Sequence, residues 1–218
     1  MIQDKSPEQL YKQAYSKYRE KKYDDAKKLI SCFIDDKNTI RKQDFLLKNI
    51  NILFLLIDIY IEQNNIENIK SAFLEIDNLI DSSKEDSSRI TYIQRRYWDY
   101  LYKLSEINFN KREWDKAEKS YLKMLDISKK LKNRELQSQT YFYLYIIYGY
   151  RTLSRRDLEI RNILNLLEYA EEFKSERRLR QNFILGYSRI IDIYMCTGNL
   201  KEAEYFIEKE HSFLDKNI

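Results

Sequence analysis

The chain has very few of the residues that make turns. Its 218 residues include 3 Gly, 1 Pro and no Val. An all-β sandwich or barrel needs a turn roughly every 8–12 residues, and such turns draw on Gly and Pro. This composition excludes the all-β class. It also excludes a doubly wound α/β fold, which binds phosphate through a glycine-rich loop.

Cysteine and histidine are equally scarce. Cys32 and Cys196 are the only cysteines, so we expect a reducing compartment and no disulfide framework. His211 is the only histidine, and its charged neighbours are typical of a solvated helix face. A Ser-His-Asp triad or a histidine-based zinc site is therefore not expected. We predict a protein that is not an enzyme, with no catalytic residue, no metal and no cofactor.

Charge and hydrophobicity narrow the class further. The chain carries 39 basic and 35 acidic residues, a net charge of +4 that is spread along its length. Nucleic-acid binding calls for clustered basic residues, so the distribution argues against it. The longest apolar stretch, 50–61, contains Asn51 and Asp58 and is too short to cross a bilayer. We expect a cytoplasmic protein with no membrane span, and the sequence is compatible with a homo-oligomer.

The apolar residues follow a helical period nearly throughout. In 53–61 the apolar positions are spaced 3, 1, 3 and 1 residues apart, which makes one stripe on a helix. Short polar breaks separate such stripes, and a second stripe follows each break at once. The breaks are Lys21-Lys22, Asn64-Asn65, Asn110-Lys111 and Gly198-Asn199. The repeating unit is therefore helix, tight turn, helix.

These turns recur at a nearly constant interval. After each one come a large apolar residue, two polar residues and a small or aliphatic residue, the last being Ala26, Ile69, Ala117 and Ala203 in turn. The intervals between them are 43, 48 and 86 residues, and the last is twice the first. A fourth, degenerate unit therefore follows Arg155-Arg156-Asp157-Leu158. We predict five helix pairs at about 6–38, 44–82, 89–131, 134–174 and 177–216, forming one solenoid domain over 1–218.

The units resemble tetratricopeptide repeats. That family places a small residue and then an aromatic in its first helix, and an alanine near the start of its second helix. The first unit has Ala14, Tyr18 and Ala26 in these roles. The resemblance implies an all-α, right-handed solenoid of about five antiparallel pairs. Two features depart from the family: the period is about 43 rather than roughly 34 residues, and the proline after the second helix is missing.

First helices line the concave surface of such a solenoid, so their outward residues are the candidates for binding. Aromatic side chains there suit a peptide ligand. The candidate partner-binding groove consists of Tyr11, Tyr15, Tyr18, Phe54, Asp58, Tyr102, Glu106, Asn110, Ser188 and Asp192. Another interpretation is that the 19 tyrosines reflect genome composition and fill core positions. The Lys/Asn clamp by which some family members bind a C-terminal carboxylate is absent from the matching positions.

Basic residues gather in and after the fourth unit. They are Arg151, Arg155, Arg156, Arg161, Arg177, Arg178 and Arg180. They could form a patch for phosphate or an acidic partner. We favour solvated charges balanced by Asp157, Glu159, Glu171, Glu172 and Glu176.

These observations favour a non-enzymatic scaffold or adaptor that binds a protein or peptide. Two alternatives stay open. One is a bacterial signalling-peptide sensor that lacks its DNA-binding domain, since the chain also resembles those regulators. The other is a helical-repeat subunit of a larger complex. An RNA-binding array and an enzyme rank below these.

Overall fold

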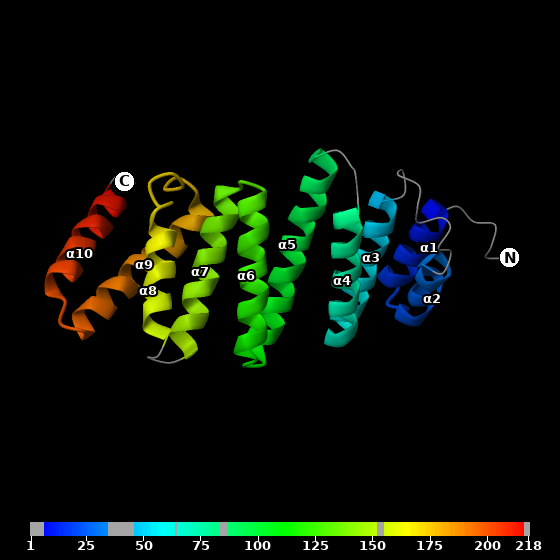
Figure 1. Cartoon of the computed structure of the whole chain (residues 1–218), viewed down its shortest axis with the longest axis horizontal. Coiled ribbons are helices and arrows are strands. Elements are labelled where there is room, and N and C mark those ends of the chain that lie inside the picture. The colour runs from blue at the N-terminus through cyan, green and yellow to red at the C-terminus, as the bar shows by residue number, and fades with distance from the viewer. Residues whose placement is uncertain (1–6, 35–45, 64, 83–86, 152–154, 216–218) are drawn as a thin grey trace. The chain divides into compact units, whose positions relative to one another are not determined.

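The protein is all-α and its helices pack as sequential pairs. The structure, a computed structural model, describes residues 7–34, 46–63, 65–82, 87–151 and 155–215. These residues form ten helices and no strand (Figure 1). The helices are α1 (Pro7–Arg19), α2 (Tyr23–Ile34), α3 (Leu46–Glu62), α4 (Ile66–Ser82), α5 (Ser87–Asn110), α6 (Trp114–Lys130), α7 (Arg134–Arg151), α8 (Arg156–Leu167), α9 (Arg177–Cys196) and α10 (Leu200–Asp215). The expected fold class is confirmed.

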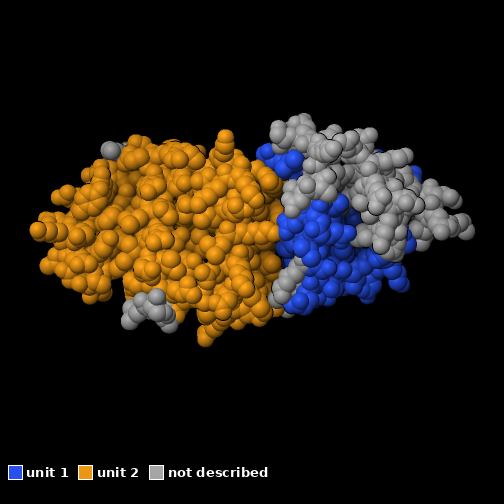
Figure 2. Space-filling model, viewed as in Figure 1, with its two compact units in different colours: residues 1–93 blue, residues 94–218 orange. Residues whose placement is uncertain are grey.

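The chain divides into two compact units, coloured separately in Figure 2. Unit 1 comprises residues 1–93 and contains α1 to α4 with the start of α5. Unit 2 comprises residues 94–218 and contains the rest of α5 through α10. The single solenoid domain over 1–218 stays a prediction.

The turns inside three of the helix pairs share one backbone conformation. Lys21, Arg112 and Gly198 have φ of 58°, 59° and 75°. In each turn, the backbone N–H of the following residue donates to the carbonyl five residues before it. The Glu113 N–H, for example, donates to the Asn108 carbonyl at 2.8 Å. This is the Schellman arrangement, which supplies partners for the last carbonyls of a helix. The predicted turns at these three positions are confirmed, and Asn64 lies outside the described residues.

Arg112 is strained because a side chain with positive φ brings Cβ too close to the backbone. We expect Arg112→Gly to raise the free energy of unfolding by about 0.5–1 kcal/mol, after the greater freedom of glycine in the unfolded chain is subtracted. The Arg112 side chain is exposed and has no ion pair among the described residues, so little else is lost. Urea denaturation followed by circular dichroism measures the change. Gly198→Ala is the matched control and should lower stability; a lower stability for Arg112→Gly would contradict this account.

Small residues let the paired helices approach closely. Ala14, Ala26, Ala117 and Ala203 are all buried, as their places in the repeat predict. Ser105 is buried at the corresponding crossing of α5 with α6, and its hydroxyl donates to the Leu101 carbonyl at 2.7 Å. The polar residue therefore satisfies its hydrogen bond within its own helix and still packs at the interface.

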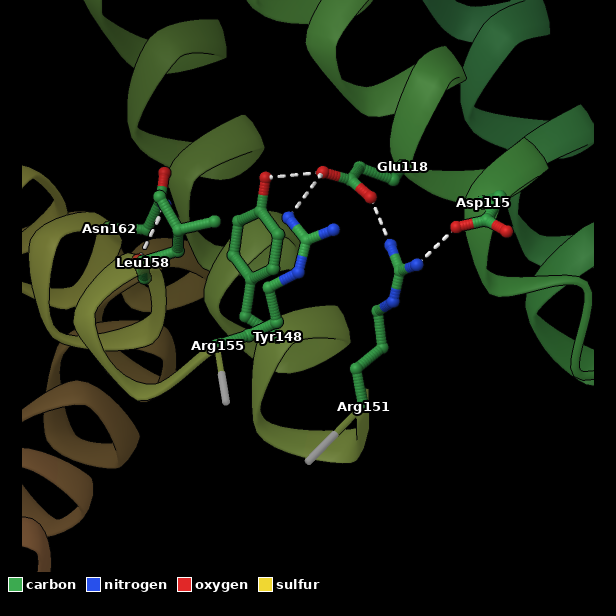
Figure 3. Close-up of polar contacts among 7 residues, drawn as sticks. All are labelled: Asp115, Glu118, Tyr148, Arg151, Arg155, Leu158 and Asn162. Atoms are coloured by element: carbon green, nitrogen blue, oxygen red, sulfur yellow. Dashed lines mark hydrogen bonds and ion pairs between the residues drawn. The ribbon is translucent and has the colours of Figure 1, made fainter. Parts of the chain in front are cut away.

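Two arginines of the fourth unit, Arg151 and Arg155, pair with acidic residues that the sequence did not indicate. Arg151, at the end of α7, pairs with both Asp115 and Glu118 of α6 (Figure 3). Tyr148 donates its hydroxyl to Glu118 at 2.9 Å, and Arg155 approaches the same carboxylate at 3.9 Å. This network joins α6 to α7, because Glu118 belongs to α6 and both Tyr148 and Arg151 belong to α7. Glu118 is largely buried, so its hydrogen bonds are stronger than they would be in water.

Candidate functional site

The first helices of the last three pairs present side chains to two adjoining cavities within unit 2. From α5 come Tyr102, Glu106 and Asn110, which lie four residues apart on one helix face. From α7 come Tyr143, Ile146 and Tyr150, and from α9 come Leu185, Ser188 and Asp192. Both triplets are spaced three and four residues apart, so each also makes one stripe. Ile146 lines both cavities. We call the two cavities together the α5–α7–α9 groove.

The first cavity, of about 260 Å³, is mainly aromatic. It is lined by Tyr102, Glu106, Phe109, Asn110, Tyr121, Phe142, Tyr143 and Ile146. We call it the aromatic cavity. The ring of Tyr143 lies 4.9 Å from that of Tyr102 and 5.5 Å from that of Tyr121, measured between centroids. Aromatic pairs at this separation stabilise each other by more than the burial of their surface area alone.

Tyr102 and Glu106 form the polar edge of the aromatic cavity. The Tyr102 hydroxyl donates to the Glu106 carboxylate at 2.6 Å. Burial raises the pKa of Tyr102, and the hydrogen bond to Glu106 raises it further because ionised tyrosine could not donate. Burial and the hydrogen bond to Glu106 both favour the protonated Tyr102 hydroxyl, which is the donor of this pair.

The second cavity, of about 410 Å³, has a buried carboxylate at its wall. It is lined by Tyr145, Ile146, Gly149, Tyr150, Glu159, Leu185, Ser188, Arg189 and Asp192. We call it the Glu159 cavity. The Glu159 side chain, only 2% exposed, accepts from Arg189 Nε at 2.6 Å and lies 3.6 Å from Arg156 Nε. A buried charge needs such partners. The expectation that Glu159 is a solvated surface charge is therefore wrong.

Gly149 makes room for this ion pair on α7. A Cβ at this position would lie 2.8 Å from Glu159 Oε1, closer than a real Cβ can approach. The absence of a side chain at Gly149 therefore lets Glu159 reach from α8 to Arg189 on α9. Tyr145, on the same helix, has a pKa that burial raises to about 12. The positive charge of Arg189 lowers this pKa, and the negative charge of Glu159 raises it.

The groove has apolar side chains that are open to solvent. Tyr150 is 66% exposed and Leu185 is 42% exposed, although both are large and apolar. Tyr150 is also held in position by two other rings. Its ring centroid lies 5.3 Å from that of Phe109, edge to face, and 6.0 Å from that of Trp114, stacked. An ordered, exposed ring beside a cavity is a suitable contact for a partner.

Sequence reasoning found part of this groove and missed its centre. Tyr102, Glu106 and Asn110 lie in the aromatic cavity, and Ser188 and Asp192 lie in the Glu159 cavity. The α7 residues were missed because the stretch from Tyr141 to Tyr150 is aromatic or apolar on all sides, so its periodicity points to no single face. The spacing of Tyr143, Ile146 and Tyr150 was the available signal.

The candidates in unit 1 form a separate row. The rings of Tyr11, Tyr15 and Tyr18 follow one another at 6.2 Å along α1. Tyr15 is 43% exposed, whereas Tyr11 and Tyr18 pack against the core. Burial raises the pKa of Tyr18, and the negative charge of Asp58 on α3 adds to the rise, so these two candidates lie near each other. Their role as partner contacts stays a prediction.

Phe54 is the candidate that the structure contradicts. It is 0% exposed and belongs to the core, so it cannot line a groove. The helix α3 packs against α1, α2 and α4, and it is therefore covered on several sides. The sequence pattern predicts a single buried stripe on α3, and this prediction is wrong. Phe54, the residue next to that stripe on the helix surface, is buried as well.

Two further classes of site are absent from the described part of the chain. No cluster of three or more His, Cys, Asp or Glu side chains there could hold a metal ion. Nor does any helix there combine the length and the apolar character needed to span a bilayer.

Comparison with known proteins identifies the fold but no family. No protein-family model and no curated protein sequence matches the chain, and no enzyme family is identified. Among solved structures, the chain is similar to BtubC (BKLC) from P. vanneervenii, with a TM-score of 0.56 and 16% sequence identity. The match covers 96% of this chain and 80% of that one. The chain therefore has a TPR-like helical-repeat fold.

Proposed function

We propose that the chain is a non-enzymatic module that binds a protein or peptide segment in the α5–α7–α9 groove. The observation that carries this proposal is the meeting of the aromatic cavity and the Glu159 cavity at Ile146. Two adjoining cavities suit successive side chains of one segment, because a peptide anchors itself through a few buried side chains.

The chemistry of the groove suits recognition. Its tyrosine hydroxyls are neutral at physiological pH and can both donate and accept hydrogen bonds. Glu159 is occupied by Arg189, so it holds neighbouring helices together and is not available to a ligand. The groups left to face a partner are exposed rings, the amide of Asn110 and the carboxylates of Glu106 and Asp192.

Side-chain hydrogen bonds also connect the helices of the groove in the absence of a partner. Within unit 2, Trp98 of α5 donates its indole N–H to Thr140 of α7 at 3.2 Å, and both side chains are buried. Arg189 of α9 in turn donates to Glu159 of α8 at 2.6 Å. A preformed surface loses little conformational entropy on association, so a short segment can bind with useful affinity.

The proposal predicts that Tyr150→Ala and Leu185→Ala each weaken peptide binding by roughly tenfold, the effect of losing one anchoring contact. Peptides would be selected from a random displayed library on the purified chain, then labelled and titrated by fluorescence anisotropy. Both side chains are exposed, so thermal stability should change little.

Matched controls lie outside the groove on α10 and α6. Tyr205→Ala and Leu122→Ala remove exposed side chains of the same two types, 53% and 46% exposed, and should leave the affinity unchanged. If these controls weaken binding as much as the groove variants, or if the groove variants have no effect, the groove is not the binding site.

A further inference from the structure

The aromatic cavity is a box of rings around one carboxylate. Its five aromatic side chains are Tyr102, Phe109, Tyr121, Phe142 and Tyr143. Its one acid is Glu106, and none of its described lining residues is Lys or Arg. At about 260 Å³ it falls below the roughly 300–1,000 Å³ of typical small-molecule pockets, so it fits a single side chain.

Glu106 forms no ion pair with the described residues of unit 2. Its Oε1 accepts from Tyr102, and no basic side chain of the described residues pairs with either oxygen. Its charge acts on the rings of the box, because it raises the pKa of Tyr121 and of Tyr143 beyond the larger effect of burial. Arg178, at the start of α9, opposes this effect at Tyr143 but does not line the cavity.

We infer that the aromatic cavity binds the positively charged side chain, Arg or Lys, of the segment held in the groove. This inference rests on the proposed function. The negative faces of aromatic rings attract a cation, and the attraction strengthens when the cation is taken out of water. Glu106 supplies the opposite charge at the mouth of the same box, where it can accept a charge-assisted hydrogen bond.

Other occupants fit less well. An acidic side chain would place a second negative charge beside Glu106. An apolar side chain would remove water from the Glu106 carboxylate and leave its charge without compensation. In the neighbouring cavity, the carboxylate of Asp192 likewise has no basic partner among the described residues.

The test uses the full chain with isotope-labelled tyrosine rings and the N-acetyl amides of arginine, lysine, leucine and glutamate as probes. The arginine and lysine amides should shift the ring resonances of Tyr102 and Tyr143 in a saturable manner. Glu106→Gln should weaken their binding by roughly tenfold, as expected for loss of one charge-assisted contact. Asp99→Asn, the same charge change elsewhere on α5, should leave it unchanged. Tighter binding of the leucine or glutamate amide, or an unaltered affinity of Glu106→Gln, would overturn the inference.

A second measurement separates this inference from the proposed function. In a peptide selected on the chain, replacing its basic residue by methionine should weaken binding roughly tenfold to the native chain and hardly at all to Glu106→Gln. Peptides that bind in the groove without such a dependence would refute the basic side chain while the peptide-binding function stands. Binding of the arginine amide without binding of any peptide would refute the function and leave the cation site.

Discussion

Raising the pH above 10 should unfold unit 2, with the transition linked to ionisation of its buried tyrosines. Burial raises the pKa of Tyr145 and of Tyr187 from 10.0 to about 12. A raised pKa means that the folded state holds the proton more tightly than the unfolded state. The stabilisation is therefore complete below pH 10 and is lost as the pH rises through about 12.

The effect is large because both side chains are buried. A rise of this size corresponds to roughly 3 kcal/mol per tyrosine, and a whole domain has only about 5–15 kcal/mol of stability. Helix content by circular dichroism and tyrosinate absorbance should change together along the titration. Tyr145→Phe removes one of the ionising groups and should move the midpoint to higher pH, whereas Tyr15→Phe, at an exposed position, should not. Complete tyrosine ionisation with the helices intact would contradict this expectation.

Replacing Phe54 by alanine should lower the free energy of unfolding of unit 1 by about 3–5 kcal/mol, the usual cost of truncating a buried phenylalanine. Its side chain is fully buried on α3, and the cavity left behind would be enclosed by the neighbouring helices. Urea denaturation of the full chain measures the loss.

Tyr15→Ala is the comparison from the same unit. Its side chain is 43% exposed, so its removal should cost no more than about 1 kcal/mol. The two variants distinguish a core residue from a surface candidate. A small change in stability for Phe54→Ala, together with lost partner binding, would contradict this assignment and show that Phe54 contacts the partner.

The helix pairs could be predicted because their signals are local. An apolar stripe needs only the spacing of a few residues, and a turn such as that at Gly198 needs only its own backbone conformation. The same reasoning placed Tyr102 and Glu106 on an outward face of α5, since the packing stripe of that helix contains Leu101 and Leu104. Part of the candidate groove was therefore within reach of the sequence.

The failures arise where a residue's surroundings come from distant parts of the chain. Phe54 was placed on a surface because nothing in α3 itself indicates how many helices cover it. Glu159 was taken for a solvated charge, although its partner Arg189 lies 30 residues further on. Likewise, Arg151 pairs with acids of α6 that precede it by more than 30 residues.

The order and pairing of the helices were encoded in the amino-acid sequence alone, because backbone hydrogen bonding and the helical period act between near neighbours. Which faces are buried, which charges are neutralised and which rings enclose a cavity were decided only by tertiary packing. The aromatic cavity shows the difference most clearly. Its lining comes from α5, α6 and α7, and the packing of those helices decides which of the described side chains lie close to Glu106.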